Sequence, residues 1–382
     1  MSLLAWALAG IAAGSIAYAL LVVAAVRSYR AVRPRRPEVL PPISILKPLA
    51  GAEDELERNL RSFFEQEYPA FEILFAVRSA NDPAVPVAER LQRQYPHVPT
   101  SLLVTGEPPY PNAKVFSLAR MLERARYDLV VMSDSDIRVT PGMLRVIAAE
   151  FQDARVGLAT CPYRAVPGKS LWSVLEALGL NTEFLAGVLA ARLVEGMRFA
   201  VGPTIVARRS ALERIGGLER VKDYLAEDFM LGKLAAEAGV GVRLSSFVVE
   251  HHIGGTRFLE NLRHRLRWAR STRRSRPAGY VGQVFTQATA AALALWAARP
   301  EWWPLAASAL LFRGIAAWAV AGGVLRDPLT KRWWWLIPVQ DLLSCLIWIA
   351  GFFGDRISWR GRQYRLCSDG RFELVGRGPA GV

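Results

Sequence analysis

Two carboxylates that follow an apolar run are well suited to metal chemistry. Residues 129–132 have no polar break, which is typical of a strand covered on both faces in a parallel sheet. Asp134 and Asp136 come next, and because they are two residues apart, their side chains point the same way in an extended chain. The carboxyl ends of such strands bind ligands, and paired carboxylates suit Mg²⁺ or Mn²⁺. We interpret the pair as a metal site; the alternative is that it caps a helix near Pro141.

Three other polar residues stand where elements of the fold are expected to begin or end. Asp82, in the sequence Asn-Asp-Pro, either only forms a turn or binds part of a nucleotide. Lys114 lies near an expected helix N-terminus, so it is either a solvated lysine or a ligand for a diphosphate. Asp228 also opens a helix, where it either complements the helix dipole or acts as a general base.

Histidine and arginine are concentrated further along the chain. His251 and His252 are adjacent, so in a strand they point in opposite directions and at most one of them should face a pocket. The basic stretch from Arg257 to Arg276 includes the sequence His264-Arg-Leu-Arg-Trp268. This stretch either lies on a membrane surface or grips phosphate, with its tryptophan as a membrane or stacking contact.

The segments that must position these residues alternate in character. Apolar runs expected as strands cover residues 43–46, 71–77, 101–104, 129–132 and 156–159. Amphipathic runs expected as helices cover residues 56–64, 87–95, 115–122 and 143–151. Such alternation predicts βαβ units, and therefore an α/β fold with a mainly parallel sheet and helices on both faces.

The following segments are less regular. Residues 171–194 predict a long helix, which either belongs to the core or lines a groove for an apolar ligand. Residues 199–201 and 205–206 are expected as short strands around Gly202-Pro203. Gly216-Gly217 should end one helix, and a further helix is expected from Ala226 to Ala238.

Apolar segments at both ends predict a membrane protein. The chain has 382 residues, 52% of them hydrophobic, and a formal charge of +14. Residues 3–26 are long enough to span a bilayer, and arginines follow them at positions 27, 30, 33, 35 and 36. A signal peptide has its charge before the apolar part, so we expect an uncleaved anchor with its C-terminal end in the cytoplasm.

Three more apolar segments, 284–298, 305–324 and 333–353, follow the basic stretch. Three crossings that start in the cytoplasm would place the tail after Gly354 outside, yet its arginines favour the inside. We therefore expect one segment to be re-entrant or interfacial. The predicted divisions are an anchor at 1–30, a cytoplasmic domain at 31–280, membrane segments at 281–355 and a basic tail at 356–382.

Composition also argues against other classes of protein. The three cysteines, Cys161, Cys345 and Cys367, have no paired or metal-ligand spacing, which disfavours a disulfide scaffold. The basic residues cluster beside apolar segments, so they predict contact with a membrane rather than with nucleic acid.

Taken together, the motifs resemble those of family-2 glycosyltransferases with the GT-A fold, and more closely ceramide glucosyltransferase and the bacterial hopanoid-associated glycosyltransferases. The resemblance covers nearly the whole chain. It rests on Asp82, Pro111-Asn-Ala-Lys114, Asp134-Ser-Asp-Ile-Arg138, Gly202 with Gly216-Gly217-Leu218, Ala226-Glu-Asp228, His264-Arg-Leu-Arg-Trp268 and the tail from Ile357 to Arg365. The ceramide enzymes usually have Gln or Arg where this chain has His264.

This resemblance implies a role for each candidate residue. Asp82, Lys114 and Asp134 would bind the donor nucleotide, and Asp134 with Asp136 would hold Mg²⁺ or Mn²⁺. Asp228 would be the catalytic base. The diphosphate and the acceptor would be bound by His264, Arg267 and Trp268.

The resemblance also implies an activity. It is the inverting, metal-dependent transfer of glucose or N-acetylglucosamine from a UDP-sugar to a hydroxyl of a membrane lipid, such as ceramide or a hopanoid polyol, which yields a β-glycolipid. The protein would be an integral protein of a bacterial inner membrane. The alternatives are a polysaccharide synthase, which needs more membrane crossings, and a non-catalytic membrane scaffold. The sequence leaves open which lipid and which sugar are used.

Overall fold

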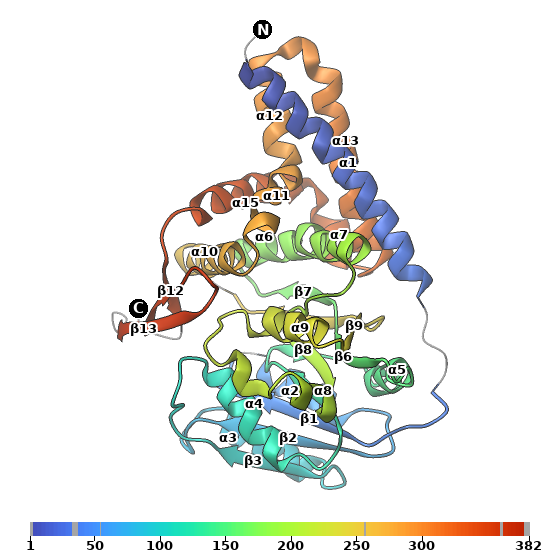
Figure 1. The fold of residues 1–382 in the computed structure, drawn as a ribbon, viewed down its shortest axis with the longest axis vertical. Helices are drawn as coiled ribbons and strands as arrows, with labels where there is room; N and C mark the ends of the chain where they lie inside the picture. The colour runs from blue at the N-terminus through green and yellow to red at the C-terminus, as the bar shows by residue number, and fades with distance from the viewer. Residues whose placement is uncertain (1–2, 33–36, 54, 256, 360–361, 378–382) are drawn as a thin grey trace.

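The computed structural model describes residues 3–32, 37–53, 55–255, 257–359 and 362–377. An α/β body forms one end of the molecule, and the helices α1 (Leu3–Ala31), α12 (Ala288–Ala298) and α13 (Trp303–Gly323) project from it as a stalk (Figure 1). Between the two lies a layer of helices that run across the stalk direction. Four of the arginines on which the predicted membrane orientation rests, at positions 33, 35, 36 and 360, lie outside the described residues.

A seven-stranded sheet, in the order β3-β2-β1-β4-β8-β6-β9, is the centre of the body. Its strands are β1 (Ile43–Pro48), β2 (Phe71–Val77), β3 (Thr100–Val104), β4 (Leu129–Ser133), β6 (Val156–Thr160), β8 (Thr204–Arg208) and β9 (Gly241–Leu244). Only β8 runs antiparallel to its neighbours in this sheet, β4 and β6. The prediction of a mainly parallel α/β fold is confirmed.

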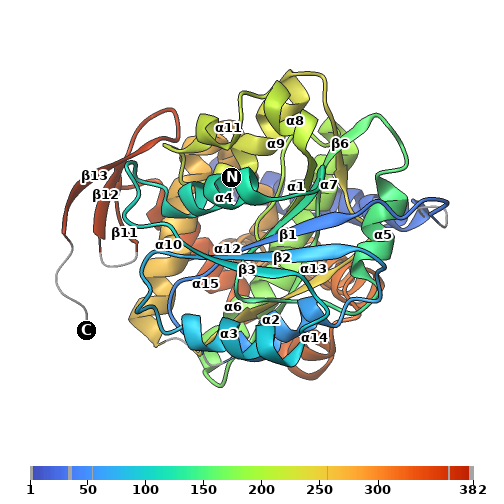
Figure 2. The same ribbon diagram turned by 90° about the horizontal axis from the view of Figure 1, so that it is seen from below.

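Helices cover both faces of this sheet. Successive residues of a strand point to opposite faces, so each strand can contribute side chains to two cores. In β1, Ile45 packs into one apolar core and Leu46 into the other, and both are fully buried. The first core lies under α2 (Leu56–Phe64), α3 (Val85–Gln94) and α5 (Met143–Glu150). The second lies under α4 (Ala113–Arg124), α8 (Arg209–Arg214), η2 (Leu218–Val221) and α9 (Glu227–Glu237) (Figure 2).

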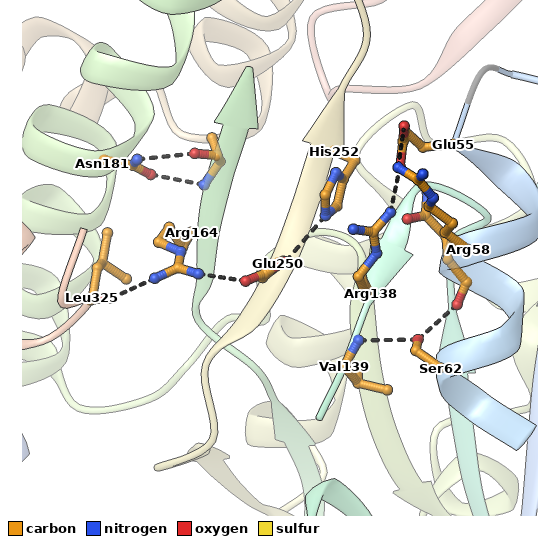
Figure 3. Close-up of polar contacts among 12 residues, drawn as sticks. Glu55, Arg58, Ser62, Arg138, Val139, Arg164, Asn181, Glu250, His252 and Leu325 are labelled. Carbon is orange, nitrogen blue, oxygen red and sulfur yellow. Dashed lines mark hydrogen bonds and ion pairs between the residues drawn. The ribbon is translucent and has the colours of Figure 1, made fainter. Parts of the chain in front are cut away.

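A smaller sheet joins the body to the helices above it. It consists of β5 (Ile137–Arg138), β10 (Val249–Ile253) and β7 (Tyr163–Pro167), with β10 in the middle. On one side, Arg138 binds Glu55 at the start of α2. On the other, the Asn181 side chain accepts from the backbone nitrogen of Ala165 at 2.8 Å and donates to its carbonyl at 3.0 Å (Figure 3). The small sheet therefore ties α2 to the helix that carries Asn181.

The layer between body and stalk contains α6 (Leu171–Gly179), η1 (Leu180–Phe184), α7 (Leu185–Glu195), α10 (Phe258–Ser275) and α15 (Ile337–Gly351). The first three form one helical run with a π-helical turn at η1, so the long helix predicted at 171–194 is confirmed. Figure 1 shows α6, α7, α10 and α15 lying across the stalk, above the body.

Within the described chain, four helical stretches are long and apolar enough to cross a membrane: Leu3–Ala31, Leu171–Glu195, Pro300–Gly323 and Pro328–Gly351. A fifth would be the pair Pro277–Thr286 and Ala288–Ala298, which is bent by 55°. The stalk helices pack through small residues, among them Ala12, Ala292 and Ala309. Small residues let helix backbones approach closely, as is usual in membranes.

The connecting elements are α11 (Pro277–Gly282), η3 (Gln283–Thr286), η4 (Pro300–Trp302), α14 (Pro328–Trp333) and η5 (Trp334–Leu336). The segment predicted at 284–298 is thus broken at Gln287, and the one at 333–353 becomes α15. In Figure 1, α15 lies across the stalk, so it is the candidate for the re-entrant or interfacial segment predicted from the charge pattern. The chain then leaves α13 on the side of the body.

The tail forms a three-stranded antiparallel sheet, β11 (Arg356–Trp359), β12 (Arg362–Leu366) and β13 (Phe372–Arg377). It packs on the body, because the Phe372 nitrogen donates to the Asp223 carbonyl at 2.9 Å. Arg362 also binds Glu107 at 3.2 Å. The tail and the body therefore lie at the same end of the stalk.

One predicted strand is wrong. Residues 199–201 are buried but do not join a sheet. The backbone of Val201 bonds instead to the Thr160 hydroxyl, which donates to its carbonyl at 2.6 Å and accepts from its nitrogen at 3.1 Å. Gly202 then turns the chain with a φ of +51°, which an L side chain rarely adopts. A side chain thus satisfies backbone groups that we had assigned to a strand partner.

Candidate active site

All the candidate residues predicted from the sequence border one open cavity of about 2260 Å³. They are Asp82, Lys114, Asp134, Asp136, Asp228, His264, Arg267 and Trp268. The cavity begins at the carboxyl ends of the strands and continues under the helical layer to α7 and α15. It thus joins a polar, carboxylate-rich region to an apolar one.

Asp134 lies directly after β4, near the centre of the main sheet. Its carboxylate binds the Lys114 ammonium at 2.7 Å, and Lys114 also binds Glu227 at 3.0 Å. Burial opposes the charged form of Lys114, but the two carboxylates outweigh it and raise the pKa of the lysine. Lys114 is therefore a fixed positive charge between two acids, and it is not the solvated lysine of the alternative interpretation.

Asp136 points toward β10, where its Oδ2 lies 3.1 Å from Nε2 of His251. Burial raises the pKa of Asp136, but His251 and Lys47 lower it by a larger amount, so the carboxyl is held ionised. Its other oxygen, Oδ1, is buried and lacks a hydrogen-bond partner among the described residues. A buried carboxylate oxygen without a partner is unusual, and a bound cation would satisfy it.

These two carboxylates fit a divalent cation whose other ligands are phosphate oxygens of the substrate and water. Among the described residues, no three His, Cys, Asp or Glu side chains converge as a closed metal site. Mg²⁺ is usually bound through one or two carboxylates together with phosphate oxygens and water, so two suffice. The alternative interpretation, that the pair caps the next helix, fails, because α5 begins after Gly142 and has no side-chain cap.

A buried lysine that was not predicted from the sequence lies under this site. Lys47, the fifth residue of β1, is fully buried and lies 3.8 Å from the centre of the Phe63 ring. Its ammonium donates to the carbonyl of Asp134 and, at 3.4 Å, to the Ser133 hydroxyl. Burial lowers the pKa of Lys47 to about 7. The signal was present in the sequence, because Lys47 ends an apolar run, much as Asp134 and Asp136 follow the apolar run of β4.

Asp228 lies in the first turn of α9 and faces the turn at Gly202. Its carboxylate accepts from the Gly202 nitrogen and, at 2.8 Å, from the Phe229 nitrogen. Burial and the nearby charge of Glu227 raise the pKa of Asp228 to about 6. A carboxyl with this pKa is mostly ionised at neutral pH but is basic enough to accept a proton.

Asp82 does form a turn, since its Oδ1 accepts from the Ala84 nitrogen at 2.9 Å. The same oxygen accepts from the Gly51 nitrogen at 2.9 Å, which joins the loop after β2 to the loop after β1. Asp82 also borders the cavity. The turn interpretation is therefore correct, and a contact with a nucleotide remains a prediction.

The far wall of the cavity is formed by α10. His264 lies 3.0 Å from the buried carboxylate of Glu176, and its ring centre is 4.6 Å from that of Trp268. The guanidinium of Arg267 lies over the ring of Trp359 in the tail, 5.8 Å from its centre. Glu176 and Trp359 also border the cavity, although neither was predicted as a site residue.

Part of the basic stretch has a structural role that we did not predict. Arg270 donates to the carbonyls of Phe353 at 3.0 Å and Arg356 at 2.7 Å, and Arg273 donates to that of Gly354 at 2.8 Å. These arginines satisfy carbonyls that follow the C-terminal end of α15. They therefore anchor α10 to α15 and to the tail.

The adjacent histidines have different partners. His251 binds Asp136, whereas His252 lies 3.1 Å from Glu250, which in turn binds Arg164 (Figure 3). Both residues border the cavity, but only His251 contacts a candidate site residue, so the prediction that at most one of them faces the pocket stays a prediction.

Comparison with known proteins assigns a family to this chain. The sequence model described as Glycosyl transferase family 21 matches residues 7–372. Ceramide glucosyltransferase 1 of Caenorhabditis elegans is 31% identical over 209 residues, which cover 54% of this chain and 44% of the relative. A ceramide glucosyltransferase of Komagataella phaffii is 37% identical over 134 residues, 34% of this chain and 26% of the relative. The chain thus matches less than half the length of each.

The fold has a counterpart among solved structures. The mannosyltransferase PcManGT of Pyrobaculum calidifontis, solved with GDP-Man and Mn²⁺, superposes with a TM-score of 0.53 at 18% sequence identity. The match covers 91% of this chain and 99% of that one. At this identity the similarity concerns the fold, which is therefore found in a glycosyltransferase.

Proposed function

The chain belongs to glycosyl transferase family 21, and on this basis we propose that it transfers a sugar from a UDP-sugar to a hydroxyl of a membrane lipid. The sugar would be glucose or N-acetylglucosamine, and the product a β-glycolipid. One observation carries the proposal: a single cavity contains the carboxylates of Asp134, Asp136 and Asp228 and extends to the apolar residues of α7. Such a cavity suits a reaction between a water-soluble donor and a lipid.

The donor would occupy the strand-end part of the cavity. Lys114 is charged and points to Asp134, so the pair is well placed to bind a diphosphate together with Mg²⁺ or Mn²⁺. Asp134 and Asp136 would hold that cation, which neutralises the charge that develops on the leaving diphosphate. Asp82, near the loops that follow β1 and β2, would contact the nucleoside.

Asp228 would take the proton of the attacking hydroxyl. The acceptor oxygen forms a bond to the anomeric carbon while the bond from that carbon to the diphosphate breaks. Attack from the face opposite the leaving group inverts the anomeric centre. The raised pKa of Asp228, about 6, suits a base that must accept a proton at neutral pH.

The acceptor would enter from the helical layer. His264, Arg267 and Trp268 line the wall between the strand ends and the apolar helices, where the lipid head group and the diphosphate would meet. On α7, the side chains of Val188, Ala191 and Val194 offer an apolar surface to the lipid chains. Residues 171–194 would then contribute both to the core and to a groove for the lipid, the two roles considered from the sequence.

We also propose an orientation in a bacterial inner membrane. The stalk would span the bilayer, with the body and the tail on the cytoplasmic side, where UDP-sugars are made. Arg27 and Arg30 at the body end of α1 support this orientation. Trp6 and Trp302 pack together at the other end, with ring centres 5.1 Å apart, as interfacial aromatic residues do.

The test is direct. The purified full-length protein in lipid nanodiscs is incubated with isotope-labelled UDP-glucose or UDP-N-acetylglucosamine, Mg²⁺ or Mn²⁺, and ceramide, a hopanoid polyol or diacylglycerol. Mass spectrometry should detect a singly glycosylated lipid that a β-glycosidase cleaves. Formation of a polymer, or hydrolysis of the donor without a glycolipid, would contradict the proposal.

A further inference from the structure

A group of polar side chains lies in the cavity wall at the end nearest the stalk. It consists of Glu183 from η1, Arg265 from α10, and Gln340 and Ser344 from α15, and we call it the inner polar patch. The Ser344 hydroxyl accepts from Arg265 at 3.0 Å and from Gln340 at 2.8 Å. The function proposed above gives this patch no role.

Two atoms of the patch have unused hydrogen-bonding capacity. Gln340 is fully buried, yet its Oε1 has no partner within the described chain. The same holds for Nη1 of Arg265. One atom is an acceptor and the other a donor, and both side chains border the cavity. Buried polar groups are nearly always paired, so this combination indicates a ligand that both donates and accepts.

A neighbouring polar network shows what a purely structural arrangement looks like here. Arg313 binds Asp341 through two nitrogens, at 2.7 and 3.0 Å, and Asp341 also accepts from the Thr289 hydroxyl at 2.6 Å. Arg313 further donates to the Thr182 hydroxyl at 3.1 Å. This network links α12, α13, α15 and η1 by hydrogen bonds. In the inner polar patch, by contrast, a buried donor and a buried acceptor have no partner among the described residues.

The patch lies beyond the proposed acceptor residues, on the way to the stalk. Glu176, which holds His264, and Glu183 are seven residues apart on one helical run, about 10 Å at the rise of an α-helix. Arg265 follows His264 directly on α10. A lipid that presents a hydroxyl near Asp228 and runs toward the stalk would therefore pass the patch.

We propose that the inner polar patch binds a second polar group of the lipid acceptor, an amide or a hydroxyl. Gln340 Oε1 and the Glu183 carboxylate would accept a hydrogen bond from it, and Arg265 would donate to its oxygen. Diacylglycerol offers only ester oxygens besides its reacting hydroxyl, so it would leave Gln340 Oε1 unpaired. The patch therefore selects amide- or polyol-bearing lipids. This inference depends on the proposed function for the identity of the acceptor end.

The experiment measures lipid binding without a donor. Three fluorescent short-chain probes, a ceramide, an alkyl polyol and a diacylglycerol, are titrated into the full-length protein in detergent. The ceramide or the polyol should bind at least about tenfold more tightly than the diacylglycerol, and the tighter of the two identifies the amide or the hydroxyl as the group recognised. Gln340→Met and Glu183→Gln should each remove about tenfold of the tighter affinity, the usual effect of losing one hydrogen bond, and leave diacylglycerol binding nearly unchanged.

Controls separate recognition from damage to the fold. Gln92→Met makes the same exchange on α3, where the side chain does not border the cavity, and all three affinities should stay as in wild type. UDP binding in the presence of Mn²⁺ should be normal in every variant. If UDP binding is not normal in Gln340→Met, Ser344→Ala is used as the test in its place. Ser344 binds both Gln340 and Arg265, so its loss should weaken binding of the same probe.

Two results would overturn the inference. One is equal binding of all three probes to the wild-type protein. The other is an equal loss of affinity for all three probes in the Gln340 and Glu183 variants, which would indicate a structural role. Selective binding without sugar transfer would instead contradict the proposed function and leave the patch as a lipid site. Transfer without any selectivity would contradict the patch alone.

Discussion

Glu227 and Asp228 are neighbours at the start of α9, yet their carboxylates have different partners. Glu227 binds Lys114 at 3.0 Å, on the side of Asp134, whereas Asp228 accepts from the backbone of Gly202 and Phe229. Both residues border the cavity. The two acids can therefore be given separate roles, one toward the donor and one toward the acceptor.

Asp228→Asn should lower the rate of transfer by about two to four orders of magnitude, the usual contribution of a general base. The affinity for UDP should stay near that of wild type, since Lys114 and Asp134 are unchanged. In the wild-type protein, kcat/KM should fall as the pH drops through about 6, because protonated Asp228 cannot accept the hydroxyl proton. Retention of most of the activity by the variant would show that Asp228 is only a helix-start residue.

Glu227→Gln should affect the donor side instead. Lys114 loses one of its two carboxylate partners, so we expect KM for the UDP-sugar to rise about tenfold, comparable to the loss of one charge-assisted hydrogen bond. Because the charge of Glu227 raises the pKa of Asp228, the acid limb of the pH–rate profile should move below 6. Glu237→Gln, at the exposed end of the same helix, is the matched control. An unchanged pH profile would contradict the coupling.

Metal dependence can be tested through Asp136. Asp136→Ala should weaken Mn²⁺-dependent binding of UDP at least about tenfold in calorimetry, because the two protein carboxylates of the site become one. Chelation with EDTA should abolish transfer by the wild-type protein, and Mg²⁺ or Mn²⁺ should restore it. Asp153→Asn, which changes a carboxylate outside the cavity, should bind UDP normally. Full activity in EDTA would rule out the proposed role of the metal.

Lys47 makes stability depend on pH in a predictable direction. Its pKa is lowered to about 7 by burial, so between pH 7 and 10 the unfolded chain holds more protons than the folded one. Stability therefore rises with pH over this range, by at most about 1.4 kcal/mol per pH unit. Lys47→Met removes this dependence. When unfolding is measured in EDTA, the free energy of unfolding of wild type should rise by about 1–3 kcal/mol relative to that of the variant between pH 7.5 and 9.5. Parallel curves for the two proteins would contradict this prediction.

Local patterns were sufficient to predict the main sheet and the aspartates at its edge. An apolar run followed by Asp134 and Asp136 marks a strand end, and strand ends of a parallel sheet meet at one edge. The partners of these residues were not predictable, because Lys47, Lys114 and His251 come from other elements of the chain. The strand predicted at residues 199–201 was wrong for the same reason, because the side chain of Thr160, some forty positions earlier, makes hydrogen bonds to the backbone of Val201.

The orientation of the chain gives a last prediction, in which the two ends of the stalk behave differently. Single cysteines are introduced at Ser79 in the body, Ser368 in the tail and Glu301 between α12 and α13, all three exposed, after Cys345 and Cys367 have been replaced. A thiol reagent that cannot cross membranes should label only the Glu301 site in intact cells and all three after lysis. The tail site should follow the body site, because Arg362 binds Glu107 and Phe372 bonds to Asp223. Labelling at Ser368 but not at Ser79 before lysis would require α15 to cross the membrane. Labelling at Ser79 would reverse the orientation and place the candidate active site away from cytoplasmic UDP-sugars.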